Sequence, residues 1–132
     1  MANRMWLPHA GCLEVDVVTL FCKIVVGASG AVTSGAGKGI VSVTKETSAG
    51  QYTVLLSDPY HTLLGCSFAL LDDADAAAAV GTAFRLNSEA VATAAAPTLV
   101  IQASDTATGA DANLTDGAIL YVTIQVRNSS VA

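Results

Sequence analysis

The sequence predicts an all-β protein, an antiparallel β-sandwich with jelly-roll-like connectivity and an irregular N-terminal arm. Three observations lead to this prediction. About seven short apolar or alternating runs are separated by turn residues, almost no segment has the periodicity of a helix, and residues 38–60 have the pattern of a β-hairpin. At 132 residues the chain suits one domain, so we expect an arm at residues 1–13 and a single β-sandwich domain at 14–132.

The arm is irregular, with Trp6 and Leu7 forming an apolar stretch before a proline. The β-branched run at 14–26 predicts the first strand, with a break near Thr19 as an open alternative. The glycine-rich segment at 27–39 is expected to be a linker of small residues. It does not match a phosphate-binding loop, because Val32 and Gly39 stand where that motif needs glycine and Ser or Thr.

Two β-branched runs at 40–47 and 51–57 flank a polar Thr-Ser-Ala-Gly link, and the second run stops at Asp58-Pro59. This is the pattern of a hairpin with turn residues in place. In the second arm Tyr52, Val54 and Leu56 share one face, which we expect to be the more deeply buried one.

The run at 63–71 predicts a central strand, because one face is apolar and the other has side chains small enough for a sheet or a subunit to approach closely. Its apolar face is expected to consist of Leu64, Cys66, Phe68 and Leu70. The following Asp- and Ala-rich residues at 72–79 fit a loop or one short helical turn, and the loop is favoured.

Three further strands are expected at 82–88, 98–104 and 118–127, with a long Gly, Ala, Asp and Thr loop at 105–116. Pro97 precedes the second of them, where its missing N–H is tolerated. The last strand alternates most regularly, and its apolar residues are Leu120, Val122, Ile124 and Val126.

The composition predicts association. Hydrophobic residues make up 52% and charged residues 13% of the chain, whereas ordinary soluble domains carry about 25% charged residues. Such a thin polar coat is typical of a subunit whose apolar surface is covered by neighbours. The net charge of -5 and six basic residues scattered along the sequence argue against nucleic-acid and membrane partners. Glu14, Asp16 and Lys23 interrupt the N-terminal apolar run, so neither a secretion signal nor a membrane span is expected.

No group of chemistry-bearing residues stands out. Cys12, Cys22 and Cys66 are an odd number without a CxxC pair, which predicts reduced, semi-buried thiols and leaves open a bridge between two of them. His9 and His61 are too few for a zinc site. We therefore expect no catalytic residues, no metal and no cofactor, and a protein that is not an enzyme.

The segment GKGIVSVTKETSAGQYTVLLSDPYHTLLGCSFALL at 37–71, together with the closing GAILYVTIQVRNSSVA at 117–132, resembles small virion proteins of tailed bacteriophages, especially capsid decoration or cement proteins. The shared pattern is a G-x-Y-T-V-x-L-x-D hairpin arm from Gly50 to Asp58, then Tyr60, and a final strand that ends in Asn-Ser-Ser. The two quoted segments contain 51 of the 132 residues. Similar patterns occur in tail-fibre and head-fibre modules.

The resemblance implies a β-sandwich protomer that forms a homotrimer over junctions between major-capsid subunits and clamps the shell. Such a protein is assembled in the host cytoplasm, resides on the capsid surface of the virion and needs no cofactor. The alternative that it implies is a head-fibre or tail-fibre module that binds a host receptor or another virion protein.

Within this hypothesis the residues expected to contact the capsid or a neighbouring protomer are Arg4, Met5, Trp6, Leu7 and Arg127. Tryptophan is a common interface anchor, and exposed arginines suit carboxylates on a capsid. The alternative for Trp6 is that it plugs the end of its own sandwich.

Overall fold

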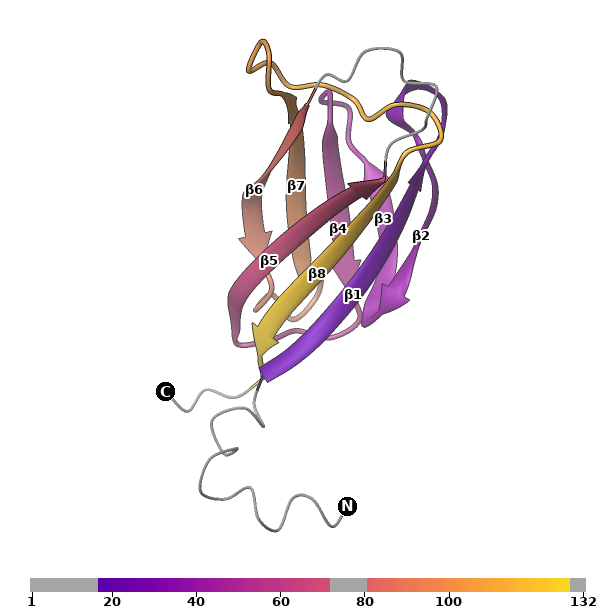
Figure 1. Cartoon of the computed structure of the whole chain (residues 1–132). Coiled ribbons are helices and arrows are strands. Elements are labelled where there is room, and N and C mark those ends of the chain that lie inside the picture. Colours follow the sequence, from indigo (N-terminus) through magenta and orange to yellow (C-terminus); the bar gives the residue numbers. More distant parts are fainter. Residues whose placement is uncertain (1–16, 72–80, 129–132) are drawn as a thin grey trace.

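The computed structural model describes residues 17–71 and 81–128, which form two four-stranded antiparallel sheets packed face to face (Figure 1). Sheet I has the order β2-β1-β8-β5 and sheet II the order β3-β4-β7-β6. The elements are β1 (Val17–Val26), a 3-10 turn η2 (Ala28–Gly30), β2 (Val32–Lys38), β3 (Ile40–Lys45), β4 (Gln51–Leu56), β5 (Thr62–Leu71), β6 (Thr82–Ala90), β7 (Thr98–Asp105) and β8 (Ile119–Arg127). The predicted antiparallel β-sandwich is confirmed.

Pairs of successive strands form hairpins within one sheet. The pairs β1–β2, β3–β4 and β6–β7 are antiparallel neighbours, whereas the chain passes from one sheet to the other after β2, β4, β5 and β7. The first and last strands, β1 and β8, lie side by side in sheet I. This order does not confirm the finer expectation of jelly-roll connectivity.

The glycine-rich segment expected to be a linker contains strand β2, so this prediction was wrong. Its glycines permit close approach between strands. A Cβ atom at Gly35 would lie 2.5 Å from Cβ of Val43 in sheet II, and one at Gly37 would overlap the carbonyl oxygen of Phe21. Gly39, with φ of +76°, then turns the chain from β2 directly into β3. Small residues are therefore required here because the edge strand leaves one sheet for the other.

The predicted hairpin is confirmed as β3 and β4, with Val43 opposite Val54 and Lys45 opposite Tyr52. Tyr52 and Val54 are fully buried, as the alternation predicted. The Tyr52 hydroxyl donates a hydrogen bond of 3.1 Å to the carbonyl oxygen of Gly30, which satisfies the polar end of this core side chain.

Strand β5 differs from its prediction in two respects. It lies at the edge of sheet I rather than in the centre, because β8 takes the position between β1 and β5. The register shifts between Leu63 and Gly65, so Leu64 is the extra residue of a bulge and is 44% exposed instead of facing the core. Phe68 does face inward, and its ring stacks on that of Phe84 in β6 at a centroid distance of 5.5 Å.

The remaining strands agree with the sequence within a few residues. β1 continues without a break past Thr19, and the arm and residues 14–16 lie outside the described residues, as does the Asp- and Ala-rich segment at 72–79. The loop expected after β7 is present. The core lies between the sheets, and its largest fully buried side chains include Tyr52, Leu20, Ile24, Leu56, Leu99, Ile101, Leu120 and Ile124.

Candidate functional site

Of the residues predicted to form an interface, the structure describes only Arg127. Arg127 ends β8 and pairs with Val17 on one side and with Thr62 on the other, and its carbonyl oxygen accepts a 2.8 Å hydrogen bond from the backbone N–H of His61. Its partly exposed side chain belongs to the outward-facing set of sheet I. Arg4, Met5, Trp6 and Leu7 lie outside the described residues.

The outer surface of sheet I, called here the sheet I face, exposes apolar side chains. Phe21 in β1 is 53% exposed, Tyr121 in β8 is 43% exposed and Leu71 in β5 is 57% exposed. Between them lie small or uncharged outward residues, namely Ser34, Ala36, Thr19, Thr123, Gln125, Gly65, Ser67 and Ala69. A surface that exposes aromatic and aliphatic side chains among small residues suits close contact with another protein.

The sheet I face is also basic. Lys23, Lys38 and Arg127 point to this side, because each lies opposite an outward-facing residue of the neighbouring strand. The partners are Tyr121 for Lys23, Phe21 for Lys38 and Val17 for Arg127. No carboxylate lies on this face among the residues that the structure describes. The Lys23 ammonium nitrogen lies 6.0 Å from the centroid of the Tyr121 ring, within range of a cation–π contact.

The sheet I face is hollowed beside Lys23. A shallow depression of about 300 Å³ is lined by Phe21, Lys23, Ala36, Tyr121 and Thr123, among others. A second depression of about 280 Å³ adjoins it at Thr123 and extends to Gly65 and Gln125. A Cβ atom at Gly65 would meet nothing within 4 Å, so the surface is open there.

The second candidate surface is the end of the sandwich where the β1–β2, β3–β4 and β7–β8 connections meet, called here the loop end (Figure 1). Asn113 joins the three connections. Its side-chain oxygen accepts a 2.8 Å hydrogen bond from the backbone N–H of Gly50, and its Cβ would be 2.8 Å from a Cβ at Gly30. The backbone N–H of Ala103 donates to Gly50 O at 2.8 Å, and that of Ala112 donates to Ala103 O at 3.2 Å. The loop end is therefore tied to sheet II by the backbone.

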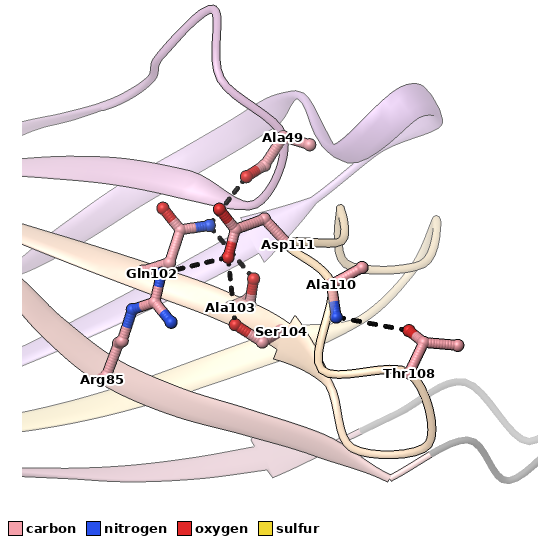
Figure 2. Close-up of polar contacts among 8 residues, drawn as sticks. All are labelled: Ala49, Arg85, Gln102, Ala103, Ser104, Thr108, Ala110 and Asp111. Atoms are coloured by element: carbon pink, nitrogen blue, oxygen red, sulfur yellow. Dashed lines mark hydrogen bonds and ion pairs between the residues drawn. The ribbon is translucent and has the colours of Figure 1, made fainter.

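Side chains complete this attachment (Figure 2). Asp111 Oδ1 accepts a hydrogen bond of 3.2 Å from Ser104 Oγ and forms an ion pair of 3.1 Å with Arg85 Nη2. Gln102 Nε2 donates to the backbone oxygens of Ala49 at 2.7 Å and Ala103 at 3.1 Å. Gln102 is only 3% exposed although it points away from the core, because these loops cover it.

The loop end is acidic. Its described carboxylates are Glu46, Asp105, Asp111 and Asp116. The basic groups beside them are Arg85, which pairs with Asp111, and Lys45, whose Nζ donates to the carbonyl oxygen of Glu46 at 3.1 Å, so the carboxylates outnumber them by two. Asp105 shapes its own turn, because its carboxylate accepts from the Ala107 N–H at 2.7 Å and from the Thr108 hydroxyl at 3.2 Å. The described domain thus has basic charge on the sheet I face and acidic charge at one end.

The cysteines in the described ranges, Cys22 and Cys66, are free thiols, and Cys12 lies outside those ranges. Burial raises the pKa of each of the two thiols to about 11. At neutral pH both remain protonated, which makes them poor nucleophiles and poor metal ligands.

Within residues 17–71 and 81–128 there is no group of three or more His, Cys, Asp or Glu side chains placed to hold a metal ion. The same ranges contain no helix that is long and apolar enough to cross a membrane.

Sequence analysis missed both surfaces. The six basic residues are scattered along the sequence, and only the strand register brings three of them to one face. The sequence did contain one signal for the sheet I face. Among the residues of β1 and β8 that point outward, a large aromatic side chain stands beside polar ones, Phe21 in β1 and Tyr121 in β8.

Comparison of this chain with models of protein families, with characterised proteins and with solved structures gives no match.

Proposed function

We propose that this chain is a structural virion protein that binds the outer surface of a tailed-bacteriophage capsid as a homotrimer and stabilises the shell. Its partners are copies of itself and the major capsid protein. It performs no catalysis, and it reaches the capsid surface of the virion after assembly in the host cytoplasm.

The observation that carries this proposal is the sheet I face. Phe21, Leu71 and Tyr121 are exposed together on one side of a protein with only 13% charged residues. Exposed apolar side chains that gather on one face of a small domain mark a surface for another protein. The resemblance of residues 37–71 and 117–132 to decoration proteins supplies the kind of assembly.

Shell stabilisation needs many modest contacts rather than one strong contact. A trimer that engages several capsid subunits at once gains avidity, which exceeds the affinity of a single contact by orders of magnitude. A sandwich with interaction surfaces and a basic residue, Arg127, opposite Val17 fits this role.

The first experiment measures oligomeric state by size-exclusion chromatography with light scattering. Three protomers of 13.3 kDa predict a mass of about 40 kDa. A stable monomer at micromolar concentration would contradict the proposal.

The second experiment measures co-sedimentation with purified capsids of a candidate phage, using the full chain and a variant that lacks residues 1–8. Trp6→Ala is expected to weaken binding, with Trp6→Phe as the matched control that keeps an aromatic side chain. Binding to host cells in the absence of any binding to capsids would favour a fibre module instead.

A further inference from the structure

We propose that the sheet I face binds the acidic loop end of a second copy of this chain. The inference rests on the homotrimer proposed above and names the contact that builds it. Each protomer then uses its sheet I face toward one neighbour and its loop end toward the other.

Charge excludes the simplest alternative, a symmetric pairing of two sheet I faces. A two-fold contact would bring Lys23, Lys38 and Arg127 of both copies together, with no carboxylate on either described face to compensate. Like charges at an interface disfavour that arrangement. A surface that carries carboxylates is therefore the better match for this face.

The loop end supplies carboxylates that its own fold leaves available. Asp116 is exposed, and Glu46 accepts one hydrogen bond of 2.7 Å from the Thr53 hydroxyl through Oε1. Asp111 and Asp105 are already engaged by Arg85 and by the turn at residues 107–108. Glu46 and Asp116 are the two that we assign to the lysines of the neighbouring copy.

The loop end also matches the apolar part of the sheet I face. Its exposed residues include Ala28, Ala31, Ala49, Ala107 and Ala110. Alanine methyl groups are small enough to approach a flat sheet closely and to cover aromatic rings such as Phe21 and Tyr121. The depression of about 300 Å³ between those rings gives such a group a place to insert.

Order at the loop end favours binding. The Gly50–Asn113 hydrogen bond joins the β3–β4 and β7–β8 connections, and the Tyr52 hydroxyl holds the β1–β2 connection at Gly30, so little conformational entropy is lost when a partner covers them. A contact between two different surfaces of the same chain is heterologous, and repeated about a three-fold axis it closes a ring.

The test reverses the charges on one surface. Lys23→Glu with Lys38→Glu is expected to raise the protomer concentration for half-assembly at least about tenfold, measured by light scattering over a dilution series. Asn87→Glu with Ser88→Glu is the control, because both residues are exposed in β6 of sheet II, toward the end of the strand that lies away from the loop end. The control is expected to assemble as the unmodified chain does, and circular dichroism checks that every variant is folded.

Charge exchange tests the pairing itself. Glu46→Lys with Asp116→Lys is expected to weaken assembly as the first variant does, and the combination of all four substitutions to restore it. If the variant with all four substitutions assembles no better than either variant with two substitutions, the loop end is not the occupant and the inference is overturned.

Other outcomes separate the inference from the proposed function. If the unmodified chain is a trimer that binds capsids and Lys23→Glu with Lys38→Glu remains a trimer, only the inference fails. If that variant keeps its trimer but loses capsid binding, the sheet I face contacts the shell instead. Binding of single-stranded DNA that is lost in the same variant assigns the face to nucleic acid and overturns the inference. An unmodified monomer that ignores capsids overturns both.

Discussion

Gly50→Ala tests whether the loop end is held as described. Gly50 has φ of +66°, and a Cβ atom there would overlap the backbone oxygen of Ala112 and lie 2.6 Å from that of Ala103. Gly109 has a similar φ of +70°, but a Cβ atom there would meet nothing within 4 Å. The two glycines therefore share the strain of a left-handed conformation and differ only in their surroundings.

The expected costs follow from that difference. Left-handed strain costs an alanine about 1–2 kcal/mol, and this is the whole effect expected for Gly109→Ala. At Gly50 the overlap also displaces three hydrogen bonds, those that join Gly50 to Ala103 and Asn113 and Ala103 to Ala112. At about 1 kcal/mol each, they bring the expected loss of unfolding free energy for Gly50→Ala to about 4–5 kcal/mol.

Equilibrium denaturation in urea, followed by circular dichroism, measures the free energy of unfolding of both variants. The two curves are fitted with the same dependence of that free energy on urea concentration. Asn113→Ala is a milder probe of the same junction, because it removes only the acceptor of the Gly50 N–H. Equal losses for Gly50→Ala and Gly109→Ala would show that the loop end is not packed against sheet II at Gly50, and the proposed contact would lose its ordered surface.

Three further predictions concern the core, the sheet I face and the thiols. Tyr52→Phe removes the donor to the Gly30 carbonyl and is expected to cost about 1–2 kcal/mol in urea unfolding; an unchanged midpoint would contradict this hydrogen bond. Phe21→Ser is expected to change stability by less than about 1 kcal/mol, because the side chain is 53% exposed, while it weakens self-association on size-exclusion chromatography. The pKa values of Cys22 and Cys66 are raised from 9.0 to about 11, so above pH 9 the unfolded thiols ionise first. Stability is then expected to fall between about pH 9 and 11, by about 2–3 kcal/mol per thiol, and to fall less in a variant with alanine at both positions; a rise over this interval would refute the burial argument.

Alternation along single strands was sufficient to predict most of the fold. In β4 and β8 every second residue is apolar, and the structure buries this set, which includes Val54 and Ile124. Such a period identifies a strand with one buried face without any knowledge of its neighbours.

Features that depend on neighbouring strands could not be predicted in this way. β2 has two glycines and little apolar character, so its sequence lacks a strand signal, and only its pairing with β1 and its approach to Val43 explain Gly35. The bulge in β5 turns the Leu64 side chain away from the core, and the amino-acid sequence around Leu64 carries no sign of it. The apolar face and the small side chains of β5 favoured a central position, although strand order places it at an edge.

The candidate surfaces could not be predicted for the same reason, because each is assembled from residues of several strands. Lys23, Lys38 and Arg127 come from β1, β2 and β8, and no window of the sequence contains all three. The prediction that concerned Arg4, Met5, Trp6 and Leu7 stays a prediction, since those residues are outside the described ranges.

The proposed self-association and the proposed shell binding would use different parts of the molecule. The chain enters the sandwich at Val17, opposite Arg127 in β8, at the end that faces away from the loop end. The proposed ring would use the loop end and the part of the sheet I face around Lys23 and Lys38, so the opposite end of the sandwich, where β1 begins, would lie outside the proposed contact (Figure 1). If this division of roles holds, Trp6→Ala will weaken capsid binding without changing the mass of the trimer, whereas reversal of Lys23 and Lys38 will change that mass first.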